Sequence, residues 1–201
     1  MESKSARPYR MTVRADAAER TGERITDAML RRFAELPYDR IRLEDVAADA
    51  EVTVQTVIRR FRTKHGLLAA TVEREFTRLA TERAAAVGRS AQATLHSLVR
   101  YYEDHGALIL KLYAEADQAP GVPELASRAR NYHVSWCREA FSEALDPELD
   151  KRTRERRLAQ FVAICDVTTW RILRFDGHLS PQQTTKALLE LLLPLLPRQT
   201  Q

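Results

Sequence analysis

Residues 43–64 have the sequence LEDVAADAEVTVQTVIRRFRTK, and this stretch decides the fold of the chain. Apolar residues recur in it at helical spacing, first over residues 46–50 and again over residues 57–61. Two helices of about two turns each cannot bury a core alone, so they need a third helix behind them. The pattern therefore predicts a helix-turn-helix, with the small side chain of Ala47 at the point where helices cross.

The outer face of the second helix is polar and basic. It carries Val54, Gln55, Arg59, Arg60 and Arg62, and Lys64 follows the helix. Arginine can donate two hydrogen bonds to guanine and glutamine can pair with adenine, while the positive charge attracts phosphates. Thr53 is placed to cap the helix, which directs its first amides at a phosphate. A solvated charged face is the plainer alternative, but the agreement of inner and outer patterns favours a DNA-binding helix.

The sequence VTVQTVIRRFRTKHGLL, residues 52–68, resembles the recognition helix of the TetR family of bacterial transcription regulators. The matching positions are Val52, Thr53, Thr56, Val57, Phe61, Thr63 and Lys64. Ile58 replaces the Tyr that is usual in the family, and Glu51 replaces the usual Gly of the turn. If the turn needs a left-handed residue, Glu51 costs about 1–2 kcal/mol that glycine would not.

The resemblance implies an all-α protein of about nine helices. A three-helix DNA-binding unit would be joined by a long helix to a C-terminal helical domain for ligand binding and dimerisation. The expected divisions are a basic, disordered N-terminal arm at residues 1–14, the helix-turn-helix domain at 15–66 and the C-terminal domain at 67–201. The arm could equally lie along a DNA groove or backbone.

The predicted DNA contacts divide by their position on the helix. Gln55 and Arg59 lie one turn apart on the outer face and are expected to read bases, with Val54 on the same helix. The residues expected to hold mainly phosphates are Arg42, Thr53, Thr56, Arg60 and Lys64. Arg42 stands where the family usually has a capping Ser or Thr, and an arginine cannot cap amides.

The composition is that of an ordinary globular protein. The chain has 201 residues, of which 44% are hydrophobic and 30% charged, and a formal net charge of +4. No apolar run is long enough for a membrane span, and residues 1–11 contain no segment suited to a secretory signal. The sequence therefore predicts a cytoplasmic protein without a membrane partner.

No cofactor, metal site or catalytic group is expected. Cys137 and Cys165 each lie in an apolar helical pattern, which favours buried thiols over a disulfide. His133 and Cys137 lie one turn apart, but two ligands do not make a metal site. An all-helical enzyme is the alternative class, and nothing in the sequence supports it, since no nucleophile or carboxylate pair stands in a recognisable setting.

The remaining helices are predicted from apolar periodicity and from stop signals. The first is expected to begin between Arg14 and Gly22 and end at Leu36, and the fourth to run from Thr63 or Lys64 to Gly88. His105-Gly106 is expected to separate the fifth helix from a short sixth. The seventh should end at Leu145, the eighth should span about residues 151–176, and the ninth should start with a capping box at Ser180.

The last two predicted helices are apolar over more than one stripe. A surface helix needs only one apolar stripe to pack on its domain, so a second apolar stripe indicates packing against another partner. A homodimer through these helices is expected, as the family resemblance also implies, and the alternative is burial within one domain. The residues predicted at the centre of this interface are Trp170, Leu173, Leu188 and Leu192.

The C-terminal domain is rich in aromatic residues on stripes expected to face inward. These suggest a mostly apolar pocket for a small hydrophobic or aromatic effector. The predicted lining is Tyr102, Leu112, Tyr113, Tyr132, His133, Trp136, Phe161, Cys165 and Asp166. Asp166 interrupts an apolar run, so its carboxylate must be paired, solvated or protonated. In the pocket it would favour a cationic ligand, whereas a nearby arginine would make it structural.

The resulting functional hypothesis is a regulator that binds double-stranded DNA at a palindromic operator as a homodimer. The resemblance implies a repressor that a small molecule in the C-terminal core releases from DNA. A constitutive architectural DNA-binding protein without an effector is the alternative within the DNA-binding class. It would show weak sequence preference and a filled core.

Overall fold

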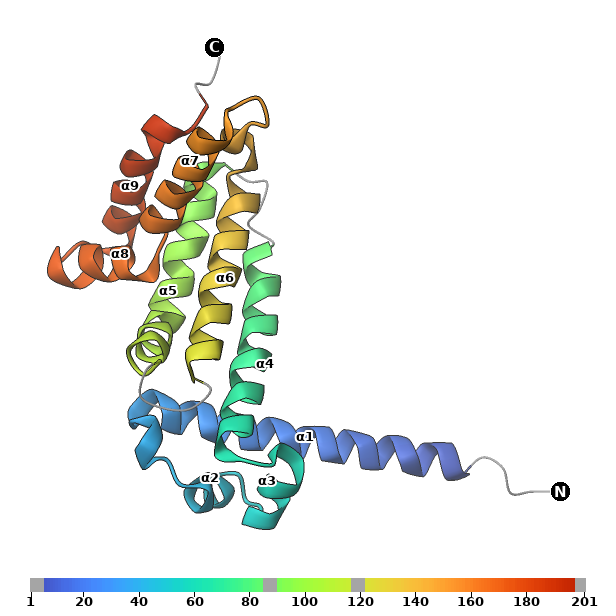
Figure 1. Ribbon diagram of the computed structural model, residues 1–201. Helices are drawn as coiled ribbons and strands as arrows, with labels where there is room; N and C mark the ends of the chain where they lie inside the picture. Colours follow the sequence, from blue (N-terminus) through green and yellow to red (C-terminus); the bar gives the residue numbers. More distant parts are fainter. Residues whose placement is uncertain (1–5, 85–89, 117–121, 198–201) are drawn as a thin grey trace. The chain divides into compact units, whose positions relative to one another are not determined.

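The computed structural model describes residues 6–84, 90–116 and 122–197. Every regular element within those residues is helical (Figure 1), which confirms the all-α fold. The chain divides into two compact units: the first comprises the described residues up to Glu75 together with Val122, and the second comprises the other described residues from Phe76 onward. The fourth helix is continuous across this division.

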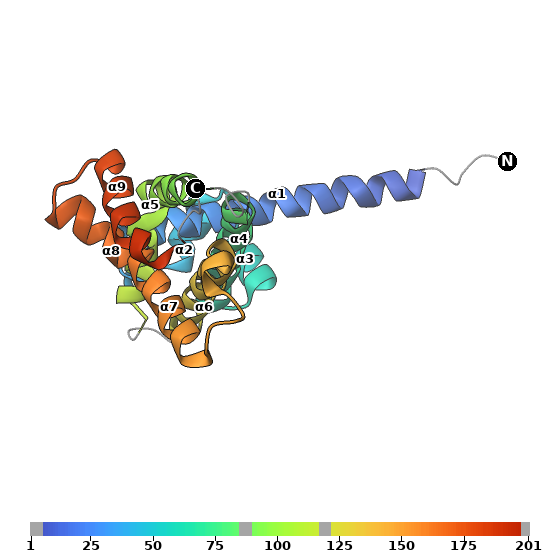
Figure 2. The ribbon, with the colours of Figure 1, turned by 90° about the horizontal axis from the view of Figure 1, so that it is seen from above.

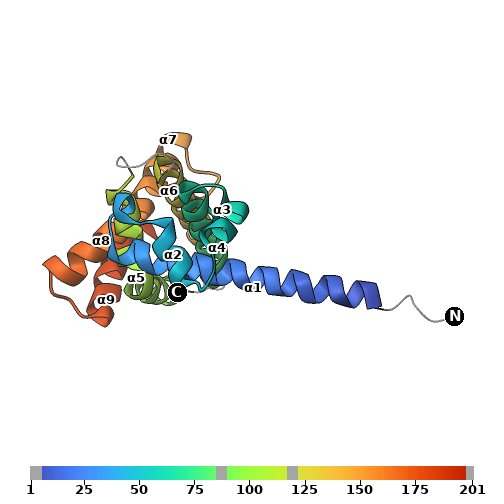
Figure 3. The same cartoon turned by 90° about the horizontal axis from the view of Figure 1, so that it is seen from below.

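The first unit is the predicted helix-turn-helix with its supporting helix. Its elements are α1 Ala6–Glu35, the short 3-10 helix η1 Tyr38–Arg40, α2 Leu43–Asp49, α3 Val54–Phe61 and the first part of α4 Lys64–Ala84. Ile25 and Phe33 of α1, Val46 of α2 and Val57 of α3 are all buried. α2 packs on α1 and α3 packs on α2 (Figure 3). α1 is therefore the third helix that the two short helices required.

The predicted start of the first helix is wrong. α1 begins at Ala6, so residues 6–14 of the expected arm are helical, and residues 1–5 lie outside the described residues. Pro8 falls in the first turn of α1, where proline is tolerated because its missing amide would have no helical partner. No glycine or further proline follows before Gly22, so nothing in the sequence interrupts the helix.

Glu51 adopts the left-handed conformation that the missing turn glycine implied. Its φ is 55°, which confirms the predicted strain. Arg24 lies 3.9 Å from the Glu51 carboxylate, but the side chain of Glu51 is 84% exposed. Because water screens such a pair, it offsets little of the backbone cost.

We expect Glu51→Gly to raise the free energy of unfolding by up to about 1 kcal/mol. Glycine removes the left-handed cost and adds some entropy to the unfolded chain, and these two effects partly cancel. Chemical denaturation measures the change. Glu51→Ala is the matched control, because it removes the ion pair and keeps the strain, and it should bring no gain. A less stable Glu51→Gly protein would show that the carboxylate stabilises the turn.

The second unit is a bundle of helices around one hydrophobic core. Its elements after α4 are α5 Ala91–Ala114, α6 Val122–Ala140, the 3-10 helix η2 Ser142–Leu145, α7 Lys151–Ile164, α8 Val167–Arg171, the π-helix η3 Ile172–Asp176, α9 Pro181–Leu192 and the 3-10 helix η4 Leu193–Leu195. α9 lies beside α5 (Figure 2). Ser180 and Gln183 form the predicted capping box of α9. The predicted end of the fourth helix at Gly88 lies outside the described residues.

The predicted break at His105-Gly106 is wrong, because α5 continues through both residues. Glycine inside a helix costs about 1 kcal/mol relative to alanine, which is why it suggested a stop. Gly106 is retained in the helix by its packing: a Cβ placed there would lie 2.4 Å from Cζ3 of Trp170. The absent side chain thus makes room for an indole from α8.

The predicted eighth helix is two helices rather than one. α7 ends at Ile164, and α8 begins at Val167 after Asp166. The Asp166 carboxylate accepts a hydrogen bond from the Thr168 amide at 2.7 Å, so Asp166 caps a new helix where the apolar pattern suggested continuation. The hydroxyl of Thr169 donates to the Ala163 carbonyl at 2.6 Å and ties the two helices together.

Candidate functional site

The outer face of α3 presents two polar side chains, those of Gln55 and Arg59, that have no partner among the described residues. Thr53 accepts a hydrogen bond from the Thr56 amide at 3.2 Å, which confirms it as the cap of α3. Gln55 and Arg59 are exposed, and neither side chain forms a hydrogen bond or ion pair with another described residue. On the opposite side Val57 is buried. α3 therefore presents exposed polar and basic side chains to solvent on a helix anchored from behind.

Other side chains of this face are partly engaged within the domain. Val54 is half-buried, and the Thr56 hydroxyl lies 3.0 Å from the Thr53 hydroxyl. Arg60 donates a hydrogen bond to the Ala18 carbonyl at 2.9 Å, which ties α3 to α1. A guanidinium has five donors, so Arg60 keeps others for a phosphate.

Lys64 is not placed as predicted. Its ammonium donates to the carbonyls of Tyr38 at 2.8 Å, Ile41 at 3.0 Å and Asp39 at 3.3 Å, and it lies 4.3 Å from the centre of the Tyr38 ring. An ammonium has three N–H donors, and all three are used. Lys64 therefore closes the C-terminal end of η1, and the expectation that it mainly holds a phosphate is corrected.

Arg42 remains consistent with its predicted position. It precedes α2 as the N-cap residue and makes no side-chain cap. Its side chain is 71% exposed and lies 3.6 Å from the Glu44 carboxylate. On the other end of α2, Asp49 accepts hydrogen bonds from the Arg32 guanidinium at 2.6 and 2.9 Å, and these bonds lower the pKa of Asp49. This pair fixes α2 on α1.

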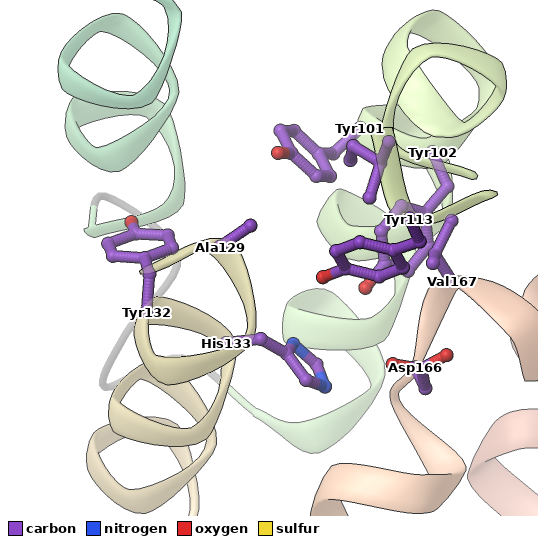
Figure 4. Close-up of a pocket in the computed structure, with 9 residues that line it drawn as sticks. Tyr101, Tyr102, Tyr113, Ala129, Tyr132, His133, Asp166 and Val167 are labelled. Carbon is purple, nitrogen blue, oxygen red and sulfur yellow. The ribbon is translucent and has the colours of Figure 1, made fainter. Parts of the chain in front are cut away.

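A small cavity in the second unit is bordered by part of the predicted effector pocket (Figure 4). The predicted residues that line it are Tyr102, Tyr113, Tyr132, His133 and Asp166. Tyr101, another aromatic residue of the inward-facing stripes, also lines it, and the lining residues that the sequence pattern did not indicate are Ile109, Ala129 and Val167. Ile109 and Ala129 stand four residues before Tyr113 and His133, so helical spacing could have found them. The cavity volume is about 20 Å³, enough for about one water molecule.

The other predicted pocket residues do not line this cavity. Leu112, Trp136, Phe161 and Cys165 are buried in side-chain packing. Phe161, for example, stacks on Phe141 with ring centres 4.6 Å apart. Periodicity identifies the inward face of a helix, but it does not tell which inward residues border an empty space.

His133 and Asp166 face each other across the cavity (Figure 4). His133 Nε2 lies 3.1 Å from the Val162 carbonyl, which can only accept, so Nε2 is the protonated nitrogen. The Cys137 sulfur lies 3.6 Å from the same nitrogen. Both cysteines are buried thiols, as predicted. Among the described residues no group of three or more His, Cys, Asp or Glu could hold a metal ion.

The residues predicted at a dimer interface are mostly in the core. Trp170, Leu188 and Leu192 are at most 3% exposed, and Leu173 is half-buried. Trp170 donates from Nε1 to the Glu103 carboxylate at 2.9 Å. Hydrogen bonds from the Arg174 guanidinium to the same carboxylate lower the pKa of Glu103. The three buried residues are therefore wrong as interface residues, because their apolar surface is already covered within the chain.

A different set of large apolar side chains is exposed in the same region. It consists of Ile172, Phe175, Leu191 and Leu193, which are 49%, 54%, 49% and 58% exposed. The apolar spacing of the last helix places Leu188, Leu191 and Leu192 in one stripe. The structure divides that stripe, because Leu188 and Leu192 are buried and Leu191 is exposed.

Comparison with known proteins identifies the first unit directly. Residues 25–71 match the sequence model of the bacterial regulatory proteins of the tetR family. No curated protein matches the chain at a significant level. None of the described helices is both long and apolar enough to cross a membrane.

Solved structures match across both units. A TetR-family transcriptional regulator from Rhodococcus sp. is 20% identical, with a TM-score of 0.65 over 89% of this chain and 100% of that chain. The regulator FadR from Bacillus subtilis, in complex with stearoyl-CoA, is 15% identical, with a TM-score of 0.67 over 87% and 99%. A transcriptional regulator from Pseudomonas aeruginosa PAO1 is 15% identical, with a TM-score of 0.68 over 87% and 89%. At sequence identities this low, the structural matches show that the fold is shared.

The described residues share the fold of these solved transcriptional regulators, with a helix-turn-helix in the first unit and a helical bundle in the second. Within the chain, the sequence of the tetR family of bacterial regulatory proteins is shown for residues 25–71.

Proposed function

We propose that the protein is a cytoplasmic repressor that binds a palindromic operator as a homodimer and is released by a small molecule. The observation that supports DNA reading is the outer face of α3, where Gln55 and Arg59 are exposed on a helix capped by Thr53. Gln55 and Arg59 would contact base edges in the major groove, while Arg42, Thr53, Thr56 and Arg60 would contact the backbone.

The exposed apolar residues support the dimer. Ile172, Phe175, Leu191 and Leu193 lie on consecutive elements of the second unit, and polar surface would be the ordinary state of such positions. A two-fold axis would bring this patch onto its own copy, since the commonest soluble oligomers use one self-complementary surface. The dimer would then present two α3 helices to two half-sites.

The cavity of the second unit supports the small-molecule response. It is bordered by residues of α5 and α6 and by Asp166 and Val167. The similar FadR structure contains stearoyl-CoA, so the fold can hold a small molecule. Because the present cavity has room for about one water molecule, a larger effector must move helices to enter. α4 continues unbroken from Lys64 to Ala84 and could pass such a movement to the first unit.

The deciding experiment is selection of bound duplexes from random DNA, followed by gel retardation of the selected duplex. A palindromic sequence with two half-sites about 34–36 Å apart would support the proposal. Equal binding to all duplexes would favour a constitutive architectural DNA-binding protein. Absence of any DNA binding would leave the all-helical enzyme class to be tested.

We expect Arg59→Ala to weaken binding to the selected duplex by about 1–3 kcal/mol and to relax preference at one base pair, because a base contact specifies sequence. Fluorescence anisotropy with the selected and with scrambled duplexes measures both effects. Arg138→Ala removes an exposed arginine from α6 in the second unit and serves as the control. Equal losses on both duplexes for Arg59→Ala would assign Arg59 to the phosphates.

A further inference from the structure

Asp166 also lines a second hollow. It is an open groove of about 420 Å³ between α6 and α7. Its lining consists of Val134, Glu155, Leu158, Ala159, Val162, Ala163 and Asp166. The groove is therefore apolar along its length, with two carboxylates and no basic side chain in its lining.

Asp166 lines both the groove and the cavity. One carboxylate oxygen accepts the Thr168 amide at 2.7 Å and caps α8. The other has no hydrogen bond or ion pair with any described residue. Glu155, by contrast, has Lys151 at 3.9 Å. A carboxylate oxygen without a partner beside apolar surface is best matched by a cationic donor, since charge-assisted hydrogen bonds are the strongest available to it.

The side chains around the cavity also favour a positively charged ligand group. The aromatic rings of Tyr101, Tyr102, Tyr113 and Tyr132 border it. The electron-rich face of such rings attracts cations, and the Arg130 guanidinium already lies 5.2 Å from the centre of the Tyr113 ring. Figure 4 places the Tyr113 ring above Asp166 and His133 opposite it. Asp166 and the aromatic rings together therefore favour a positively charged group.

Size narrows the chemistry further. About 20 Å³ accommodates a group of the size of one water molecule, such as a primary ammonium. A trimethylammonium group carries three additional methyl groups and does not fit the cavity as it stands. The groove, in contrast, has room for an apolar chain or ring next to the same carboxylate.

We propose that this site binds a primary amine with an apolar body. The ammonium group donates to Asp166 at the mouth of the cavity, and the apolar body lies in the groove between α6 and α7. The inference rests on the proposed function in one respect, since it names the chemical class of the effector. The inference goes beyond the proposed function because it places most of the ligand outside the cavity, in the groove.

Three probes of equal chain length test the head group: octylamine, octyltrimethylammonium and octan-1-ol. Calorimetry with the full chain, in the absence of DNA, measures their affinities. At neutral pH octylamine is charged, as lysine is. We expect octylamine to bind at least about tenfold more tightly than either other probe, because only octylamine forms a charge-assisted hydrogen bond within the available space.

Two variants test the placement. Asp166→Asn keeps an oxygen to cap α8 and should remove the preference for the amine over the alcohol, whereas Asp150→Asn changes the equivalent cap of α7 and should not. Ala159→Phe fills the groove at an exposed position and should weaken octylamine at least about tenfold while circular dichroism shows an unchanged helical content.

Several outcomes overturn the proposal. Equal affinity for octylamine and octanol, equally tight octyltrimethylammonium, or an amine preference that survives Asp166→Asn would each do so. If the wild-type protein binds no amine, and if the Ala159→Phe variant sediments differently from the wild-type protein, a second copy of the chain covers the groove. Gel retardation of the selected duplex is measured separately, so amine binding by a protein that never binds DNA would overturn the proposed function alone.

Discussion

A chain in which Ile172 and Leu191 are both replaced by glutamate is expected to remain folded, to sediment as a monomer and to lose tight binding to the palindromic duplex that we propose as its operator. Both side chains are 49% exposed, so charge at these positions costs the isolated chain little. Charge at the centre of a two-fold interface would meet its own copy and would have to be desolvated there. The double substitution therefore acts on association rather than on folding.

The expected loss in DNA affinity is large. Two linked recognition helices gain about 10²–10⁴ in affinity over one, and a monomer forfeits that gain. Sedimentation velocity and anisotropy on the same samples measure the two effects. The matched control is Thr168→Glu with Gln182→Glu, which adds the same charge at exposed polar positions of α8 and α9. If the protein with both Ile172→Glu and Leu191→Glu still sediments as a dimer, the interface lies elsewhere on the chain.

Replacement of Leu192 by alanine is expected to reduce the free energy of unfolding by about 2–5 kcal/mol without separating the dimer. Leu192 is fully buried within one chain, where its removal leaves a cavity. Denaturation at two protein concentrations distinguishes a core role from an interface role. If Leu192 acts in the core, the loss of unfolding free energy is the same at both protein concentrations. If Leu192 acts at an interface, that loss changes with dilution. A folded, monomeric Leu192→Ala protein of unchanged stability would restore the interface role that periodicity suggested.

Leu191 and Leu192 show what periodicity can and cannot establish. Both fall in one stripe of the apolar pattern of the last helix, together with Leu188. Which of these residues meet the chain's own core depends on how α9 is rotated against α5, and the periodicity of one helix contains no information about its neighbour. The apolar pattern was predicted, but its division between buried and exposed residues was not.

Local chemistry was predicted more reliably. Thr53 was expected to cap α3, Glu51 to be left-handed and Ser180 with Gln183 to form a capping box, and the structure confirms each. These features depend on residues within a few positions of one another, so the sequence contains both partners. Gly106 shows the limit, because its indole partner Trp170 lies several helices further along the chain.

The cavity illustrates the same division between local and distant information. Asp166 was recognised as a carboxylate in need of a partner, and both of the predicted kinds of partner were side chains or ligands. The partner in the structure is a backbone amide two residues ahead, which the helical pattern concealed because it did not predict a new helix there. The carboxylate nevertheless lines the cavity as well, since a cap uses only one of its oxygens.

The bonds of Lys64 to η1 have a consequence for chemical labelling. In acylation the amine nitrogen attacks the reagent and must be accessible to it, whereas the Nζ of Lys64 is held against three backbone carbonyls. Acylation of Lys64 should therefore proceed only through transient opening of the segment that joins α1 to α2, while exposed Lys151 and Lys186 react at once. Mass spectrometry of partly acylated protein would then measure how fast the first unit opens, because the acylation rate of Lys64 can be compared with the rates of Lys151 and Lys186 in the same sample.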